Sequence, residues 1–355
     1  CRLMSELKVN SIKGVAASDA AITINNTDGT CSANLSNRQG KNLVDNGAFA
    51  IRQRAATSNT TGGTLIDRFA VNFANHDEAL TQSHVDVASG TTPYTLGFRR
   101  ALRITNGNQT SGANANDFVG MNHVVESMNV SMSGWNYKSP SSYISVSFWI
   151  KASVSQKYYA RLFSSDGTVK VWVIDTGVIA ANTWTKITDK IPGHADLQFD
   201  LDGGAGLNIQ FIPYYGTDFT DNSVPIGSWT GSSGSAQVPD MTTTWWTTND
   251  ATFEVTGFQI EVGPNVTDFM FETPAVDQER CMRYYIQRPA GGGIVIAQTN
   301  IYIHTTFPVV MRGAPTVTVT PGAGAAAGII ASAFGFYCYG TLAVQAASYT
   351  ASAEY

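Results

Sequence analysis

The sequence predicts an all-β protein: a jelly-roll-like β-sandwich with an extended N-terminal segment and a small C-terminal β-domain. Short segments of alternating apolar and polar residues recur along the chain, separated by Gly, Asn, Asp, Ser and Pro. Hydrophobic residues make up 43% of the 355 residues, which is enough for a core. Charged residues make up only 14%, whereas about 25% is usual. Uncharged polar residues must therefore solvate the surface, as is common in β-rich extracellular or particle-bound proteins.

Residues 1–41 form the first predicted region, and they contain few large apolar side chains. Residues 21–27 resemble a short strand, and residues 25–29 a turn. Such a segment cannot build its own core, because it buries too little apolar surface to offset the entropy of ordering. We expect it to attach to a partner or to intertwine with identical chains.

Residues 42–274 form the second predicted region, a sandwich of two antiparallel sheets. One face of residues 143–151 is apolar and the other is mostly polar; the apolar positions are Ile144, Val146, Phe148 and Ile150. Residues 206–212 place Leu207, Ile209 and Phe211 inward. Residues 168–175 set three valines, Val169, Val171 and Val173, opposite Lys170, Trp172 and Ile174. Residues 252–262 turn Phe253 and Val255 inward, and Gly257 allows a bulge before Phe258, Ile260 and Val262.

Residues 275–355 form the third predicted region, a small β-domain. Residues 275–287 have the only plausible helical pattern, which Pro289 ends. Strand-like segments follow; they are residues 294–297, 301–307 and 316–320, with one or two more between 335 and 355. Residues 321–328 resemble a Gly/Ala loop.

Charge, hydropathy and cysteine spacing exclude several classes of protein. The formal net charge is −5, so no basic nucleic-acid footprint is present. The longest apolar runs, such as residues 294–297, are too short for membrane insertion. Residues 1–10 lack the apolar region of a signal peptide, so general secretion is not expected. The cysteines, Cys1, Cys31, Cys281 and Cys338, form no C-x-x-C pair, and we expect them to be reduced and structural.

The sequence predicts neither a catalytic set, a metal site nor a cofactor. No nucleophile elbow, Walker loop or dinucleotide fingerprint is present. Three aspartates before Gly203 could supply oxygen ligands to calcium, but solvated turns explain them equally well; they are Asp196, Asp200 and Asp202. Four carboxylates are candidates for a glycosidase pair, but nothing in the sequence brings two together; they are Asp86, Asp175, Glu254 and Glu261.

The aromatic residues suggest a binding function. Several lie in polar, loop-like surroundings, where flat rings stack on sugars and nearby amides bond the hydroxyls. The glycan-binding residues predicted in this way are Trp135, Tyr137, Tyr214, Tyr215, Trp229, Trp245 and Trp246. The alternative for each ring is that it caps the sandwich or lines a subunit contact.

Several segments together resemble phage tail-fibre and virion structural proteins of the marine phage or cyanophage type. Residues 42–49 (NLVDNGAF) are similar to the opening strand of a carbohydrate-binding-module-like jelly roll, and residues 145–152 (SVSFWIKA) to a later strand. Residues 253–273 and then 279–285 (ERCMRYY) follow in the order seen in those proteins. Residues 307–318 are similar to their C-terminal domain, and residues 4–12 to their start. The resemblance implies a virion structural protein and carries over no catalytic residue.

We therefore expect a phage tail fibre or appendage on the virion that mediates adsorption to host-surface polysaccharide without catalysis. Its expected partners are other virion proteins, through residues 1–41, and two further copies of itself in a homotrimer, because such fibres usually are trimers. Weak sugar contacts repeated on one particle raise avidity by roughly 10² to 10⁴. The first alternative is a capsid decoration or tail-assembly protein without a receptor. The second and least favoured alternative is a polysaccharide depolymerase, because the long β-helical repeats that are common in such enzymes are absent from the sequence.

Overall fold

The computed structural model describes residues 9–15, 21–24, 31–33, 41–288, 301–320, 328–340 and 348–355. Strands account for 44% of the chain and helices for 7%, which confirms the all-β class. The chain forms two compact units. The first contains residues 1–41 and 267–270, and the second contains residues 42–266 and 271–355.

The first unit contains a small antiparallel sheet of β1 (Ser11–Ile12), β2 (Ile22–Ile24) and β3 (Cys31–Ala33). Strand β2 lies within the strand expected over residues 21–27, whereas the expected turn at 25–29 lies outside the described residues. Ile12 is half exposed, and Ile22 and Ile24 are half-buried. Lys41 ties the ends of this unit together, because its ammonium donates hydrogen bonds to Thr267 and to the Asp268 carbonyl.

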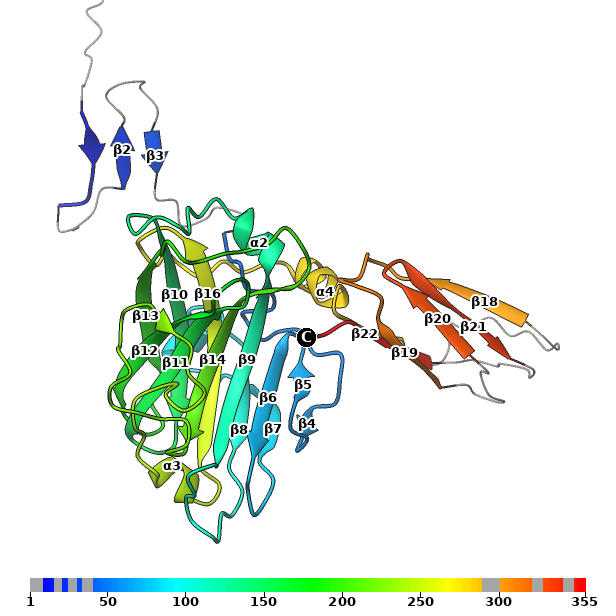
Figure 1. Ribbon diagram of the computed structural model, residues 1–355, viewed down its shortest axis with the longest axis horizontal. Coiled ribbons are helices and arrows are strands. Elements are labelled where there is room, and N and C mark those ends of the chain that lie inside the picture. Colours follow the sequence, from blue (N-terminus) through cyan, green and yellow to red (C-terminus); the bar gives the residue numbers. More distant parts are fainter. Residues whose placement is uncertain are drawn as a thin grey trace, which may run out of the picture. The chain divides into compact units, whose positions relative to one another are not determined.

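The second unit contains a sandwich of two antiparallel sheets (Figure 1). The six-stranded sheet has the spatial order β13 (Thr185–Pro192), β10 (Tyr143–Ala152), β16 (Thr252–Val262), β8 (Arg100–Thr105), β7 (Thr81–Asp86) and β4 (Thr57–Ser58). The seven-stranded sheet has the order β15 (Thr230–Gly231), β12 (Lys170–Ile179), β11 (Gln156–Ser164), β14 (Ala205–Tyr215), β9 (Phe118–Glu126), β6 (Phe69–Ala74) and β5 (Gly63–Ile66). The short helices are α1 (Thr92–Thr95), α2 (Ser127–Ser131) and α3 (Thr244–Thr247).

The core between the sheets includes the apolar positions that alternation predicts for β10 and β14. All four apolar positions of β10 and all three of β14 belong to one buried cluster. Phe148 of β10 and Phe211 of β14 meet across the sheets with ring centroids 4.8 Å apart. Each fully buried side chain of this size stabilises the fold by about 1.5–3 kcal/mol.

Gly257 forms the bulge that its position in β16 predicts. Its φ is +63°, and the pairing of β16 with β10 shifts register at this point. A Cβ at this position would lie 2.7 Å from the ring of Phe98. Glycine therefore satisfies both the left-handed backbone and the close approach of an aromatic ring.

Side chains on both faces of β12 are buried. The alternation of residues 168–175 did not show which of the two faces lies against the core between the sheets. Trp172 and Ile174 face the core between the sheets, and the valines lie on the outer face of the seven-stranded sheet. Val171 and Val173 are nevertheless buried there, because a loop over residues 216–241 covers them. We call this segment the wall loop.

The C-terminal strands form two small three-stranded sheets around a separate apolar cluster. One sheet contains β17 (Tyr285–Arg288), β22 (Ser348–Ser352) and β19 (Thr316–Thr320), and the other contains β18 (Ile301–Thr306), β21 (Gly335–Gly340) and β20 (Gly328–Ser332). We call residues 285–355 the C-terminal module. The segment expected at 294–297 lies outside the described residues, as does most of the loop at 321–328. Cys281 and Cys338 are buried free thiols.

Helix α4 (Pro274–Met282) precedes the C-terminal module and ends earlier than the pattern of residues 275–287 predicts. Pro274 occupies the first helical turn, where its missing N–H costs nothing. Residues 285–288 instead pair with β22, with Ile286 opposite Ala351. Ile286 is buried in the module's apolar cluster, so tertiary packing overrides the local helical pattern here.

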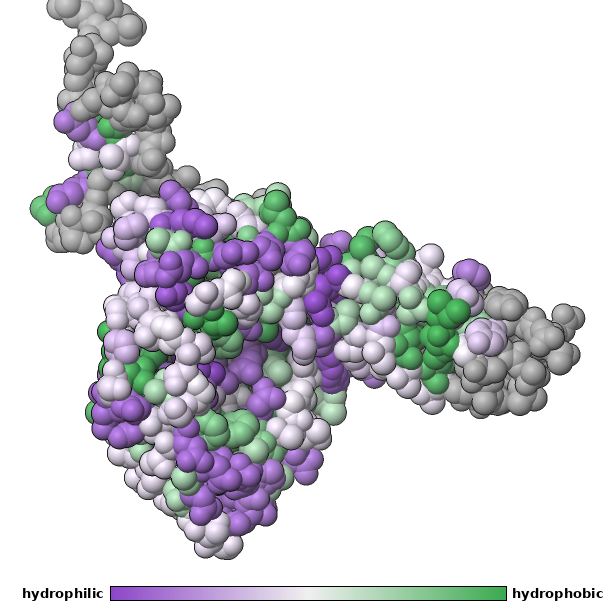
Figure 2. All heavy atoms as spheres, in the orientation of Figure 1, coloured by the Kyte–Doolittle hydropathy of each residue, from purple (hydrophilic) through white to green (hydrophobic). Residues whose placement is uncertain are grey.

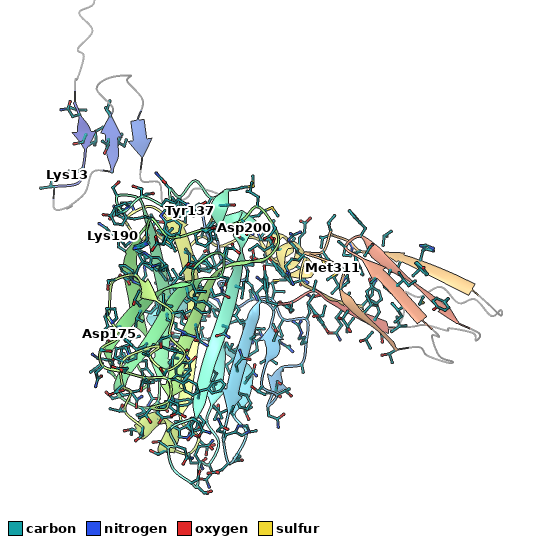
Figure 3. The ribbon with its side chains drawn as sticks, in the orientation of Figure 1. Lys13, Tyr137, Asp175, Lys190, Asp200 and Met311 are labelled. Atoms are coloured by element: carbon teal, nitrogen blue, oxygen red, sulfur yellow. The ribbon has the colours of Figure 1, made fainter. Side chains whose placement is uncertain are left out.

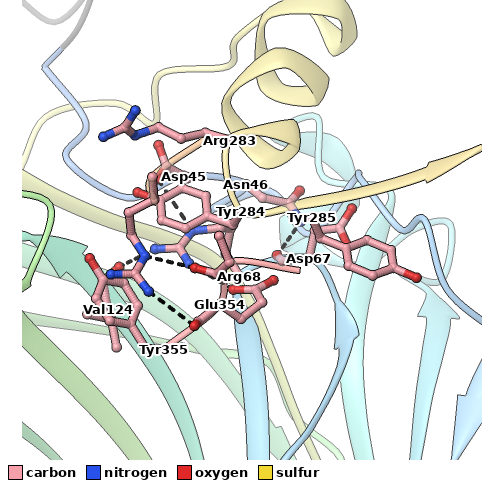
Figure 4. Close-up of polar contacts among 12 residues, drawn as sticks. Asp45, Asn46, Asp67, Arg68, Val124, Arg283, Tyr284, Tyr285, Glu354 and Tyr355 are labelled. Carbon is pink, nitrogen blue, oxygen red and sulfur yellow. Dashed lines mark hydrogen bonds and ion pairs between the residues drawn. The ribbon is translucent and has the colours of Figure 1, made fainter. Parts of the chain in front are cut away.

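Buried charges join the sandwich to the C-terminal module (Figure 4). The Arg283 guanidinium binds both oxygens of Glu126, at 2.6 and 2.8 Å, and the Tyr284 hydroxyl donates to Glu126 at 2.5 Å. Arg68 donates to Glu354 at 3.1 Å, and its guanidinium carbon lies 3.3 Å from the centroid of the Tyr284 ring. We call this cluster the junction.

No helix among the described residues has the length and hydropathy needed to span a membrane.

Candidate functional site

The outer face of the seven-stranded sheet has a row of polar side chains across three adjacent strands. Arg161 of β11 pairs in register with Gln210 of β14, and Gln210 pairs with Asn122 of β9. Cross-strand partners project from the same face of a sheet. Their chain neighbours, Leu162 and Ile209 among them, face the core. Arg161, Gln210 and Asn122 therefore lie side by side on the outer face, and we call them the polar row.

The polar row is held in place by contacts among its own side chains. Nε of Arg161 donates to Oε1 of Gln210 at 2.6 Å. The Gln210 side chain lies over Gly120, where an added Cβ would come within 2.9 Å of Nε2. The guanidinium carbon of Arg161 also lies 5.0 Å from the centroid of the Phe163 ring. Glycine on β9 thus provides the space in which the amide lies on the sheet.

Asn208 extends the polar surface by one position along β14. It is the register partner of Phe163, and its Nδ2 donates to the Ser165 hydroxyl at 2.5 Å. In the polar row itself, Oδ1 of Asn122 accepts no hydrogen bond from any described residue. Arg161, Phe163 and Asn122 all retain some solvent exposure. This face therefore presents parts of a guanidinium, an aromatic ring and the Asn122 side chain to solvent, whereas Gln210 and Asn208 are only 7% and 8% exposed.

The wall loop borders this polar surface and rises above it, because the loop packs on the outer face of the sheet. Val224 and Val238 of the loop pack on outward side chains of the sheet, including Val173 and Ile212. Asp240 fixes the loop on itself by accepting from the Thr220 hydroxyl at 2.9 Å and from the Asn222 amide at 2.7 Å. Figure 2 shows a hollow in the surface of the sandwich, in which hydrophilic (purple) and hydrophobic (green) residues meet.

Burial shapes the electrostatics of this face. It lowers the pKa of Arg161, which keeps its charge because a guanidinium does not deprotonate at physiological pH. For Tyr215 burial acts in the opposite direction: it raises the pKa of the phenol to about 12, and the nearby Arg161 opposes this rise only in part. At neutral pH the surface therefore has a positive guanidinium next to a neutral phenol.

Five of the seven aromatic residues predicted to bind glycans have buried side chains. Trp245 and Trp246 are fully buried in the core, where Trp246 stacks on Tyr214 with centroids 5.3 Å apart. Trp135 is 3% exposed, and its indole N–H donates to the Ser142 carbonyl. Tyr215 is 5% exposed but interacts with Arg161 beside the polar row. A sugar needs an open ring face, so Trp135, Tyr214, Trp245 and Trp246 are core residues instead.

The remaining two of these aromatics, Tyr137 and Trp229, are half-buried. Tyr137 lies in the connection before β10 (Figure 3) and packs edge-on against Phe199, with centroids 5.0 Å apart. The Trp229 indole donates to the Pro192 carbonyl at 2.7 Å and packs edge-on against Trp172. Both rings are thus engaged in packing away from the polar row.

The carboxylates considered for catalysis are each held by a neighbour. Asp86 pairs with Arg100, and Asp175 pairs with Lys157 at 2.9 Å. Glu254 lies between two cations, Arg103 and Lys151, and Glu261 accepts from the Gln259 amide at 3.0 Å. The aspartates Asp196, Asp200 and Asp202 do not converge, since the described part of the chain has no group of three potential metal ligands of the His, Cys, Asp or Glu type.

Sequence reasoning missed Arg161, Gln210, Asn122 and Asn208. The signal was present, because Asn208 and Gln210 alternate with the inward Leu207, Ile209 and Phe211. Alternation marks such residues as outward-facing but not as neighbours of residues from other strands. Four of the aromatic residues predicted instead, Trp135, Tyr214, Trp245 and Trp246, are buried in the core.

No family model matches the chain. No curated protein matches it. Several solved structures are similar to its sandwich. The enzymatically active domain of bacteriophage CBA120 tailspike protein 4 is 10% identical over 63% of this chain and 22% of its own, with a TM-score of 0.34.

Two carbohydrate-binding modules are also similar. A CBM4 module is 10% identical over 62% of this chain and 99% of its own, with a TM-score of 0.29. The family 11 module from Clostridium thermocellum, solved with a β-1,3-1,4-mixed-linked tetrasaccharide, is 12% identical over 60% and 96%, with a TM-score of 0.26. These likenesses are remote, so the function of this chain has to be argued from its own side chains.

Proposed function

We propose that this protein binds glycans, without catalysis, on the outer face of its seven-stranded sheet. The observation that carries the proposal is the polar row: Arg161, Gln210 and Asn122 side by side, bordered by Phe163. Amides and guanidinium groups bond sugar hydroxyls, and an aromatic ring packs against the apolar face of a sugar. The row contains no carboxylate, so it supplies neither a general acid nor a nucleophile for glycoside hydrolysis.

The rigidity of the row favours binding. Each amide lies on a strand of a wide sheet, and Gln210 is fixed by Arg161 on one side and by the space over Gly120 on the other. Binding groups that are already ordered lose little entropy when a ligand arrives.

Binding of the purified protein to a panel of polysaccharides tests the proposal. In affinity electrophoresis or calorimetry we expect Gln210→Ala to weaken binding about tenfold, which corresponds to about 1.4 kcal/mol. Tyr137→Ala is the matched control, because Tyr137 packs on Phe199 and does not contact the row. If Tyr137→Ala weakens binding and Gln210→Ala does not, the glycan does not bind at the polar row.

For the biological role, the protein is proposed to be a tail fibre or similar appendage on a phage virion, forming homotrimers. It would attach through residues 1–41 and adsorb to host-surface polysaccharide. The uncharged polar surface and the order of segments similar to phage fibre proteins support this role. The test is adsorption: the protein should bind host cells, and particles without it should adsorb poorly. If it binds neither cells nor their polysaccharide while such particles adsorb normally, the role is lost.

A second candidate is a capsid decoration or tail-assembly protein without a receptor. The C-terminal module favours it, because Phe334 and Ile330 are 69% and 52% exposed there. Exposed apolar side chains of this size commonly mark contacts with other proteins. Imaging of the virion distinguishes the two roles, since an assembly protein would have this module buried against a neighbouring subunit.

A further inference from the structure

Among the described residues, Arg161 is a half-buried arginine whose partners are all neutral side chains; Arg312 also lacks a carboxylate, but three backbone carbonyls accept hydrogen bonds from its guanidinium. Its described contacts are the Gln210 amide, the Tyr215 phenol and the Phe163 ring. No described carboxylate lies within ion-pair distance of its guanidinium. By contrast, Arg68 and Arg283 each pair with carboxylates in the junction.

A shielded guanidinium without a carboxylate is costly, because its charge has lost part of its hydration without a counter-charge. Gln210 and Tyr215 engage only part of the Arg161 guanidinium, which carries five N–H donors. The planar fork of the remaining donors fits the two oxygens of a carboxylate or a sulfate. The partner that this side chain lacks within the protein is therefore an anion.

We infer that the glycan bound by the polar row is acidic, and that Arg161 pairs with its carboxylate or sulfate group. This inference rests on the proposed function and narrows its substrate class to polysaccharides with uronate or sulfate-ester groups. The row spans about 10 Å at roughly 4.8 Å per strand. An anionic group on Arg161 therefore leaves the hydroxyls of the same or the next sugar for Gln210 and Asn122.

Phe163 and the wall loop strengthen the pairing. Apolar side chains next to a guanidinium lower the local dielectric, so an ion pair there is stronger than on an open surface. Phe163 contributes such a surface on one side of Arg161, and Tyr215 contributes its buried ring on another. Arg161 is thus a specificity-determining residue that distinguishes acidic from neutral polysaccharides.

Matched polysaccharide pairs test the inference with the full-length protein. Polygalacturonate is compared with its fully methyl-esterified form, and a sulfated galactan with agarose, so each pair differs mainly in charge. We expect the acidic member to bind at least about tenfold more tightly, and its binding to weaken as NaCl rises from about 50 to 500 mM. Arg161→Gln should abolish the preference, and Arg161→Lys should restore part of it.

Lys186→Gln is the charge-matched control, because Lys186 is an exposed cation on β13 of the other sheet. Equal binding of acidic and neutral members, unchanged by Arg161→Gln but weakened by Gln210→Ala, overturns the inference and leaves the proposed function standing. Equal loss of preference in Arg161→Gln and Lys186→Gln also overturns it, since net charge would explain the effect. Binding to no polysaccharide of a broad acidic and neutral panel contradicts the proposed function itself.

Discussion

The junction and the polar row are built from similar residues and differ in what those residues bind. In the junction, Arg68 and Arg283 bind Glu354 and Glu126, and tyrosine rings cover the guanidinium of Arg68. In the polar row, the guanidinium of Arg161 has an amide, a phenol and a phenylalanine ring. A cluster in which every arginine is paired with a carboxylate of the same chain holds two parts of the fold together. A charge that is left without a counter-ion on an accessible face is available to a ligand.

The largest expected effect is in the junction. Arg68 is 3% exposed, and Arg68→Ala removes the ion-pair partner of Asp45 and leaves Glu354 with Arg54 alone. We expect the free energy of unfolding to fall by about 3–5 kcal/mol, as when one partner of a buried ion pair is removed. Urea denaturation followed by tryptophan fluorescence measures this.

The comparison predicts that Arg161→Ala costs much less stability, about 1 kcal/mol, because it leaves no carboxylate unpaired. Similar losses for the Arg68 and Arg161 variants would show that the two clusters have the same structural role.

The second effect is a pH dependence of stability beside the junction, where Arg54 pairs with both Asp67 and Glu354. Burial raises the pKa of Asp67 from 3.8 to about 6, although the Arg54 guanidinium 2.6 Å away opposes this shift. The unpartnered Oδ2 of this carboxyl is consistent with a protonated group. Because the folded protein then binds more protons than the unfolded chain, stability falls as pH rises from about 4 to about 6. The loss is up to about 3 kcal/mol for a shift of this size.

Asp67→Asn, which remains neutral, should lack this contribution. The difference in unfolding free energy between wild type and variant should therefore change between about pH 4 and 7, in favour of the wild type at low pH. Parallel stability curves for the two proteins would mean that Asp67 ionises normally.

The smallest expected effect sharpens the description of the polar row. Gly120→Ala places a Cβ 2.9 Å from Nε2 of Gln210, so the amide must move while every polar group remains. We expect glycan binding to weaken about threefold to tenfold, with a loss of stability of about 1 kcal/mol. Gly134→Ala is a control for added bulk alone, since a Cβ there meets no atom within 4 Å, although its positive φ adds strain. Unchanged binding in Gly120→Ala would show that the position of the Gln210 amide is unimportant.

Much of the fold could be predicted because strand alternation is a local property. The inward positions of β10 and β14 follow from the two-residue period alone, and the bulge at Gly257 follows from one glycine in an apolar strand. The same reasoning overextended the helix at 275–287, where pairing of Ile286 with β22 decided the outcome. Local propensity is a weak guide where a distant strand offers hydrogen bonds and burial.

The proposed binding site could not be predicted, because its members come from strands far apart in the sequence. Arg161, Gln210 and Asn122 meet through pairings of β11, β14 and β9, and nothing within each segment specifies those pairings. The wall loop decides that the outward valines of β12 are buried, and core packing decides that Trp245 and Trp246 are not a sugar platform.

The sequence by itself determined that this chain forms sandwiched strands with few charges, because period and composition act residue by residue. Only the tertiary structure decided which outward side chains are covered and which stay open. It also decided which arginine meets a carboxylate and which does not, since these outcomes depend on which distant strands become neighbours.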